Sequence, residues 1–208
     1  MRVLFTFLFL LCTALEGATM HALLLIDTQA EELETAMAQN LKHWQRRLNE
    51  IKLYTDYTVK TTVLQGDDLR VSKITEALSK MQVKKEDAVL FYFCGHGCRT
   101  KAKEDIWPYL ALSPENVLID YMEILSYFAY LEPRVLFAMA DCCNNVIDSG
   151  TSPVPKSMKK KNYRALFQDK PIWIACSSSE PGEYSWAWVG KGSCFTLEFM
   201  KALDHEVR

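Results

Sequence analysis

The stretch Ala88-Val-Leu-Phe-Tyr-Phe-Cys-Gly-His-Gly97 decides the fold that this sequence predicts. It begins as an unbroken apolar run, which is typical of a strand buried on both faces of a parallel sheet. The run stops at Gly95-His96-Gly97, where the two glycines allow a sharp turn and a close approach by another chain segment. We therefore expect His96 at the carboxyl edge of the sheet, beyond which open α/β sheets bind their ligands.

A second apolar run, Arg134-Val-Leu-Phe-Ala-Met-Ala140, has the same character and ends on Asp141-Cys142-Cys143-Asn144-Asn145. If the two strands are neighbours, their carboxyl ends bring a thiol and an imidazole to one edge of the sheet. A nucleophilic Cys–His pair requires that arrangement.

The rest of the chain alternates between strand and helix patterns. Apolar or β-branched runs predict four further strands at His21–Ile26, Tyr57–Leu64, Pro171–Cys176 and Tyr184–Val189. Amphipathic or capped segments predict helices at Glu31–Ile51, after Ser72 as a possible N-cap, and at Val117–Leu131, Asn162–Gln168 and Ser193–Leu203. The segments Cys98–Pro114 and Asn144–Asn162 are polar and predict surface loops. Together these elements predict a mostly parallel α/β sheet of about six strands, with helices on both faces.

The composition fits one well-buried domain. The chain has 208 residues, of which 49% are hydrophobic, and its formal net charge is −2. This length is enough for one sizeable core and too small for two. Because the charge is nearly balanced, we expect no nucleic-acid partner.

The amino terminus predicts a secretory signal peptide over residues 1–18, followed by a single domain over residues 19–208. Arg2 is followed by the apolar run Val3–Leu15 and by the small residues Gly17 and Ala18. An uncleaved membrane anchor is the alternative, but the apolar run falls short of the roughly 20 residues that span a bilayer. We therefore expect a secreted or periplasmic protein with no membrane contact once the signal is removed.

The cysteines allow two other interpretations. Cys94, His96 and Cys98 alternate and could face a metal in an extended chain, although zinc sites usually space their cysteines differently. Of the seven cysteines, six remain once Cys12 is removed, and a secreted protein could pair them as disulfides. Against pairing, three of the six lie in or beside apolar strands, where free cysteine often serves as a small core residue.

The two strand ends resemble those of a known family. Phe91-Tyr-Phe-Cys-Gly-His-Gly97 resembles the Tyr-Tyr-Ser-Gly-His-Gly signature of metacaspases and other caspase-like peptidases, with Cys94 where serine is usual. Asp141-Cys-Cys143 resembles the Asp-x-Cys signature of the same peptidases. That alignment makes Cys143, and not its neighbour Cys142, the match to the nucleophile.

Two further segments carry the resemblance toward the carboxyl end. Pro181-Gly-Glu-Tyr-Ser-Trp186 resembles the Pro-Gly-x-Tyr-Ser-Trp segment of caspases, and Gly192-Ser-Cys-Phe-Thr196 resembles their Gly-Ser-x-Phe. The resemblance extends from about His21 to Leu203. It implies a caspase-like three-layer α/β sandwich with a six-stranded sheet, in agreement with the strand pattern.

The resemblance also implies a mechanism and a specificity. His96 would take the proton from Cys143, whose thiolate attacks a peptide carbonyl. The backbone N–H groups of Gly97 and Cys143 would hold the oxyanion. Asp141 matches the acidic residue that lines the substrate pocket of metacaspases, while Ala187 stands where caspases carry an arginine. A cysteine endopeptidase that cleaves after Arg or Lys is therefore expected.

Some positions depart from the family pattern. Asn144-Asn145 replaces the His-Ser that commonly follows the metacaspase nucleophile, and only Asp120 partly resembles the acidic pair of calcium-activated members. We therefore expect no metal and no cofactor, with protein or peptide substrates as the partners. The mobile-looking composition near Lys156 and Lys159-Lys160-Lys161 additionally predicts self-processing after a basic residue in that loop.

Two other classes of function remain open. A caspase-like binding or regulatory module would keep the fold with an idle thiol. A redox protein would use the adjacent pair Cys142-Cys143, but a vicinal disulfide is strained and no Cys-x-x-Cys pattern occurs.

Overall fold

Five parallel strands form the central sheet of the computed structural model, which describes residues 17–144 and 160–207. From one edge to the other, the sheet contains β2 (Thr58–Gln65), β1 (Thr19–Ile26), β3 (Ala88–Cys94), β7 (Val135–Asp141) and β8 (Ile172–Ser177). Every neighbouring pair is parallel. The strands β3 and β7 are buried along their whole length, as their unbroken apolar runs predict.

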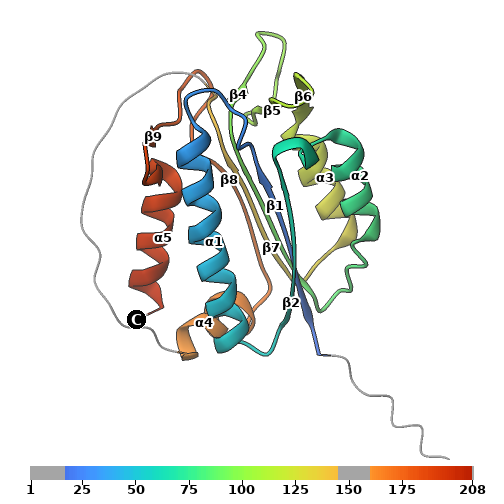
Figure 1. Cartoon of the computed structure of the whole chain (residues 1–208). Coiled ribbons are helices and arrows are strands. Elements are labelled where there is room, and N and C mark those ends of the chain that lie inside the picture. Colours follow the sequence, from blue (N-terminus) through green and yellow to red (C-terminus); the bar gives the residue numbers. More distant parts are fainter. Residues whose placement is uncertain (1–16, 145–159, 208) are drawn as a thin grey trace, which may run out of the picture.

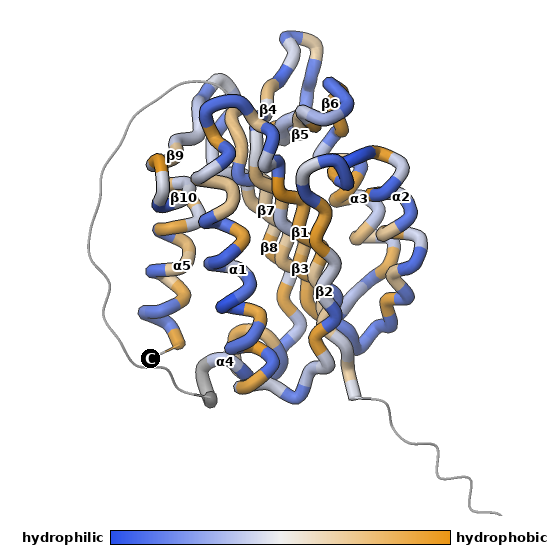
Figure 2. The backbone as a smooth tube through the Cα atoms, in the orientation of Figure 1, coloured by the Kyte–Doolittle hydropathy of each residue, from blue (hydrophilic) through white to orange (hydrophobic). Residues whose placement is uncertain are grey.

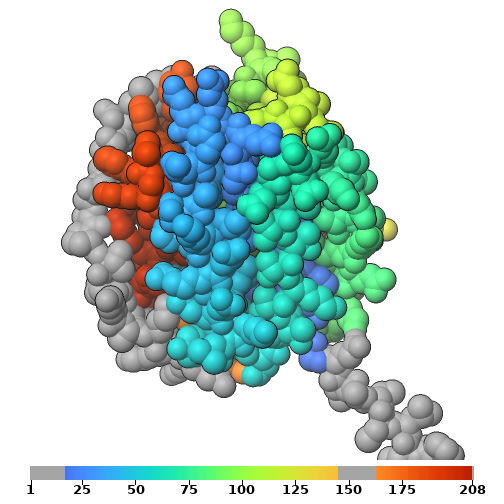
Figure 3. Space-filling view, in the orientation of Figure 1, coloured from blue at the N-terminus to red at the C-terminus, as the bar shows by residue number. Residues whose placement is uncertain are grey.

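Helices cover both faces of this sheet, which confirms the predicted α/β sandwich (Figure 1). One face carries α1 (Glu34–Tyr54), α4 (Lys160–Phe167) and α5 (Cys194–Glu206), and the other carries α2 (Val71–Lys80) and α3 (Tyr121–Leu131). In the space-filling view, α1 and α5 lie side by side on the surface (Figure 3). Because the helices connect parallel strands, the carboxyl ends of all five strands lie at the same edge of the sheet.

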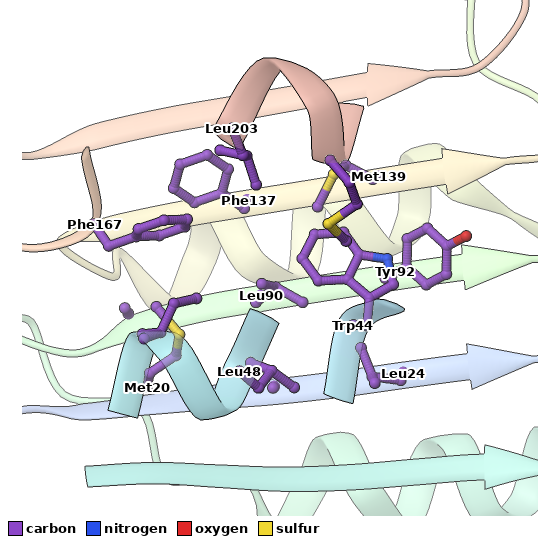
Figure 4. Close-up of a cluster of buried hydrophobic side chains, with 14 of the residues drawn as sticks. Met20, Leu24, Trp44, Leu48, Leu90, Tyr92, Phe137, Met139, Phe167 and Leu203 are labelled. Carbon is purple, nitrogen blue, oxygen red and sulfur yellow. The ribbon is translucent and has the colours of Figure 1, made fainter. Parts of the chain in front are cut away.

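The side chains of β3 show why two helix layers are needed. Successive residues of a strand point to opposite faces, so Tyr92 lies on one side of the sheet and Phe91 on the other. Tyr92 packs against Trp44 of α1, with ring centroids 5.2 Å apart (Figure 4). Phe91 packs against Phe128 of α3, with centroids 5.8 Å apart. The hydropathy colouring shows the apolar strands enclosed between helices whose outer faces are hydrophilic (Figure 2).

The predicted sixth strand does not join the sheet. Within the described residues, the predicted strand Tyr184–Val189 contains only β9 (Ala187–Trp188), which pairs antiparallel with β10 (Gly192–Ser193). The preceding residues pair elsewhere, because Asn144 forms an isolated antiparallel bridge with Glu183. The central sheet in this part of the chain therefore has five strands rather than about six.

The predicted loop Cys98–Pro114 and the start of the next predicted helix are also different. They contain a three-stranded antiparallel sheet made of β4 (Gly97–Cys98), β5 (Tyr109–Leu112) and β6 (Val117–Asp120). The helix α3 consequently begins at Tyr121 and not at Val117. Asp120 ends the last strand and caps the helix, because its carboxylate accepts a hydrogen bond from Met122 N–H at 2.9 Å.

The other helices begin or end a few residues from their predicted bounds. The helix α1 runs from Glu34 to Tyr54 rather than from Glu31 to Ile51. Ser72 does not cap α2, because that helix begins at Val71 and has no side-chain hydrogen bond at its N-cap. The short 3₁₀ turn η1 (Gly66–Asp68) connects β2 to this helix.

No helix in the described residues is long and apolar enough to cross a membrane. The predicted signal peptide lies outside the described residues, apart from its last two positions, and so do Lys156 and Lys159 of the predicted processing loop.

Candidate active site

The two predicted catalytic residues follow neighbouring strands in matched positions. Cys94, the last residue of β3, pairs with Asp141, the last residue of β7. His96 and Cys143 each follow two residues after that pair. His96 and Cys143 therefore both lie just beyond the carboxyl ends of adjacent strands, in equivalent positions.

Gly97 brings the chain after His96 into direct contact with the chain at the cysteine pair. A β-carbon at Gly97 would lie 2.4 Å from Cys142 Sγ and 2.7 Å from the carbonyl oxygen of Cys143. Both separations are far shorter than a van der Waals contact, so only glycine fits. The main chain at Gly97 therefore packs directly against the Cys142 side chain and the Cys143 carbonyl oxygen.

The Cys143 thiol is partly buried and lies against the main chain of Ser185. Ser185 N–H donates to Cys143 Sγ at 3.4 Å, and the thiol lies 3.6 Å from the Ser185 carbonyl oxygen. Burial raises the pKa of the Cys143 thiol, the Ser185 N–H opposes that shift, and the nearby Asp141 carboxylate adds to it. The resting thiol is therefore protonated at neutral pH and needs a base to become a nucleophile.

His96 has its side chain exposed to solvent, while its backbone is fixed. Its carbonyl oxygen accepts a hydrogen bond from Ala111 N–H of β5 at 3.0 Å. In the described part of the chain, Cys143 Sγ contacts Ser185 and makes no hydrogen bond with the imidazole. Catalytic hydrogen bonds often form only when substrate binds, so the lack of one here is compatible with a base that engages with a bound peptide.

Cys142 has different surroundings from its neighbour. It is 1% exposed, and its carbonyl oxygen accepts hydrogen bonds from Ser178 Oγ at 3.0 Å and Ser179 Oγ at 2.9 Å. Burial raises the pKa of the Cys142 thiol well above its ordinary value. A thiol so enclosed, with its pKa raised, packs like a small apolar side chain and is a poor nucleophile.

Asp141, the predicted substrate-binding residue, is 2% exposed and lies at the centre of a polar network. Its Oδ1 accepts one long hydrogen bond, from Ser185 Oγ at 3.4 Å. Its Oδ2 accepts hydrogen bonds from Ser193 Oγ, from Thr196 Oγ1 at 2.7 Å, from Tyr92 OH at 3.0 Å and from Asn40 Nδ2 at 3.4 Å. Burial raises the pKa of the Asp141 carboxyl, and these hydrogen bonds oppose the shift. Spare acceptor capacity thus remains on Oδ1, on the side of Ser185.

Ser185 links the thiol to this carboxylate, and sequence reasoning did not identify it. It contacts Cys143 through its main chain and Asp141 through its hydroxyl. Its presence in the segment Pro181–Trp186 that resembles caspases was the available signal. The same residue lines a groove of about 650 Å³ whose walls include Trp186 and Phe199.

The possible metal sites of the sequence are not assembled in the structure. Cys94 is buried inside β3, and the Asp120 carboxylate pairs with the Lys103 ammonium at 2.7 Å. Among residues 17–144 and 160–207, no group of three or more His, Cys, Asp or Glu side chains is arranged to hold a metal ion. The six cysteines from Cys94 to Cys194 are free thiols, so neither the disulfide framework nor a Cys142–Cys143 disulfide is present here.

Comparison with known proteins gives one positive result. The family model described as caspase domain matches residues 20–207, which covers the sheet, both helix layers and the site. No curated protein matches the chain.

Proposed function

The chain belongs to the caspase-domain family of peptidases, and from that premise we propose that it is a cysteine endopeptidase with His96 as base and Cys143 as nucleophile. The observation that carries this proposal is the pairing of Cys94 with Asp141 in neighbouring strands. His96 follows Cys94 by two residues, and Cys143 follows Asp141 by two residues. The close packing of Gly97 against Cys142 and Cys143 supports it, because it places the segment after His96 beside the segment that carries Cys143.

Because the pKa of the Cys143 thiol is raised, the thiol needs a base, and we assign that role to the His96 imidazole. His96 accepts the proton of Cys143 Sγ as the sulfur attacks the peptide carbonyl carbon. The C–N bond then breaks, and the imidazolium returns the proton to the leaving amine. Water, deprotonated by His96, hydrolyses the thioester and frees the Cys143 thiol.

The oxyanion of the tetrahedral intermediate is assigned to the backbone N–H groups of Gly97 and Cys143. Each such donor contributes about 3 kcal/mol to the stability of the transition state.

We assign cleavage to peptide bonds that follow Arg or Lys. Two observations favour a cationic side chain: the spare acceptor capacity of Asp141 Oδ1 and the charge of the neighbouring groove. The charged residues that line this groove beside Ser185 are Glu183 and Glu198, which are both acidic. A buried carboxylate forms its strongest hydrogen bonds with a cationic donor.

A panel of fluorogenic peptides that differ only in the residue before the scissile bond tests the proposal. We expect turnover of the Arg and Lys members and none of the Asp member. A lysyl or arginyl fluoromethyl ketone should label Cys143, as located by tandem mass spectrometry, and the label should be absent from His96→Ala protein. Preferred cleavage after Asp would refute the specificity.

The second candidate is a caspase-like binding or regulatory module with an idle thiol. The contact of Cys143 Sγ with the Ser185 main chain favours it, because this segment occupies the space beside the nucleophile. A folded wild-type protein that neither cleaves the panel nor reacts with the ketone would establish this second function in place of the first.

We also propose that the protein is secreted or periplasmic, on the grounds of the apolar run Val3–Leu15. Amino-terminal sequencing of the exported protein should find a chain that begins after Ala14, Gly17 or Ala18. Recovery of the intact Met1 terminus from the membrane fraction would instead favour an anchor.

A further inference from the structure

A buried ammonium group organises the loop that follows His96 and β4. The side chain of Lys103 is 2% exposed, and its Nζ lies 2.9 Å from Asp105 Oδ2 and 2.7 Å from Asp120 Oδ2. The same nitrogen lies 4.5 Å from the centroid of the Tyr109 ring. Burial disfavours the charged amine, but the hydrogen bonds that it donates to the two carboxylates outweigh this effect and raise the pKa of Lys103. The loop that follows β4 therefore surrounds the charged ammonium group of Lys103.

Arg99 connects this loop to the residue after the nucleophile. Its Nη2 donates to the carbonyl oxygens of Lys103 at 2.9 Å and of Asp105 at 2.6 Å. Its Nη1 donates to Asn144 Oδ1 at 3.3 Å. The guanidinium therefore finds its carbonyl acceptors only when the loop has the shape that Lys103 imposes.

Asn144 is fully buried, and its contacts hold the chain as it leaves Cys143. Its Nδ2 donates to the carbonyl oxygen of Ile106 at 3.0 Å, and its backbone N–H donates to that of Glu183 at 2.7 Å. One contact joins the loop after His96, and the other joins the segment that carries Ser185. The position of the Cys143 backbone thus depends on the loop.

We propose that Arg99, Lys103, Asp105, Asp120 and Asn144 form an ionic clasp that aligns His96 with Cys143, and that Lys103 is its principal positioning residue. The clasp joins the chain leaving β3 to the chain leaving β7 on the solvent side of their contact at Gly97. Within the described residues, the hydrogen bonds of the Cys143 thiol go to Ser185 and to no member of the clasp, so the clasp acts by position. This inference rests on the proposed His96–Cys143 pair.

A purely stabilising ion pair would have a different arrangement. The exposed pair Lys85–Glu132, at 2.8 Å, joins two surface positions, and such pairs contribute little. Lys103 instead neutralises two carboxylates, and the loop they enclose presents carbonyl acceptors to Arg99. Loss of the ammonium leaves Asp105 and Asp120 to repel each other, which opens the loop and releases Asn144.

Three variants test the role of the ammonium. Lys103→Met keeps most of the apolar stem over Tyr109 without the charge, and Lys103→Arg keeps a cation. Lys103→Ala leaves a space that matches propylammonium, the part of the lysine side chain beyond Cβ. Lys85→Met, which removes the exposed ion pair, is the matched control. Circular dichroism and thermal melting establish that each variant is folded.

Two measurements report the alignment. The first is the split between kcat and KM on the best peptide of the panel. The second is the rate at which iodoacetamide alkylates Cys143 between pH 5 and pH 9, located by tandem mass spectrometry. A thiol aligned with an imidazole reacts at a lower pH than an isolated thiol, so this profile reports the pair without requiring turnover.

We expect Lys103→Met to lower kcat about a hundredfold, as a misplacement of about 1 Å does, with little change in KM. Its alkylation profile should shift to higher pH. Propylammonium should restore both properties to Lys103→Ala protein, whereas propanol at the same concentration should not. Lys103→Arg should keep a large part of the activity, and Lys85→Met should match the wild type.

Other results would overturn the clasp. A folded Lys103→Met protein with the wild-type kcat and alkylation profile would do so, and so would a loss of activity that tracks unfolding and resists propylammonium. If Lys103→Met and Lys103→Ala both fail to fold, Asp105→Asn makes the same comparison, and an unchanged alkylation profile there would refute the role. If the wild type does not cleave peptides, the proposed function fails, and the alkylation profiles alone decide whether the clasp aligns Cys143.

Discussion

Two buried aspartates, Asp87 and Asp141, lie at opposite ends of the central sheet and use their carboxylates differently. Asp87 precedes β3 at the amino end of the strands and accepts hydrogen bonds from Thr19 N–H at 2.7 Å and from Lys84 N–H at 2.9 Å. Its Oδ2 also lies 3.3 Å from His21 Nε2. Asp141 ends β7 at the carboxyl end and is surrounded by side-chain donors.

The difference lies in what each carboxylate connects. Asp87 binds two main-chain N–H groups and thereby fixes where β1 and β3 begin. Asp141 joins side chains from α1, β3, β10 and α5 and is linked through Ser185 to the Cys143 thiol. A carboxylate bound by the main chain stabilises the sheet alone, whereas one bound by side chains from several elements also sets how those elements surround the site.

The largest expected effect on turnover comes from replacing the proposed nucleophile, and its buried neighbour is the comparison. Cys143→Ala should lower turnover by at least about a thousandfold, because no other group can form the covalent intermediate. Cys142→Ala should leave a folded enzyme of similar activity, since the Cys142 thiol is enclosed in the core. Peptide hydrolysis by the two purified proteins makes the comparison, and the reverse order of activities would contradict the assignment.

The two aspartates themselves should give different losses. Asp141→Asn should lower kcat/KM for Arg and Lys peptides by about tenfold to a hundredfold, since a charge-assisted hydrogen bond becomes a neutral one. Asp87→Asn should lower the free energy of unfolding by about 1–3 kcal/mol and leave kcat/KM of the folded protein unchanged.

Urea unfolding and kinetics on both variants check this contrast between the two ends. An Asp141→Asn protein that loses stability but keeps its preference for basic residues would mean that the carboxylate at the site end is structural as well.

Ser193 tests whether the Asp141 network works as one unit. It caps α5, because its Oγ accepts from Thr196 N–H at 3.3 Å, and it also donates to Asp141. Ser193→Ala should cost about 1 kcal/mol of stability through the lost cap. It should also lower kcat/KM, but by less than Asp141→Asn does. Thermal melting with kinetics at one substrate concentration far below KM measures both, and an unchanged kcat/KM would show that the network does not reach the site.

The smallest expected effect concerns acid, and it belongs to the Asp87 end. Burial lowers the pKa of His21 below 6.5, and this outweighs the opposing influence of Asp87. The unfolded chain therefore binds the proton more readily, and the stability that is present above pH 6.5 is lost as the pH falls toward the folded pKa. The slope is at most about 1.4 kcal/mol per pH unit.

Melting curves from pH 7.5 to pH 5 should show this loss in the wild type and less of it in His21→Gln protein. Identical pH dependence in both would place the acid-sensitive group elsewhere.

The central strands were predictable because of their chemistry. A strand buried on both faces must be apolar at every position, and few other structures tolerate the run Ala88–Cys94. The helix α1 was equally clear, because its buried residues recur at helical spacing. Both predictions depend only on local pattern. The sequence placed His96 and Cys143 at one edge of the sheet on the condition that their strands are neighbours, and the structure shows that they are.

The small sheet and the displaced sixth strand were not predictable in the same way. The strand β4 has two residues and β6 has four, which is too short for a period to appear. The alternating segment Tyr184–Val189 has a strand pattern, but the main chain of Ser185 contacts the Cys143 thiol instead of a sixth strand position. Lys103 was missed since charged residues in a polar segment usually indicate a solvated loop, and only the fold brings Asp120 beside it.

The lack of a side chain at Gly97 determines how closely the segments that carry His96 and Cys143 pack together. The segment that follows His96 packs directly against Cys142 and Cys143, since a single methyl group on Gly97 would overlap Cys142 Sγ and the Cys143 carbonyl oxygen. A β-carbon at this position would therefore force the two segments apart. Gly97→Ala should displace the two segments from each other. The activity that this variant keeps would measure how much misalignment of His96 and Cys143 the reaction tolerates.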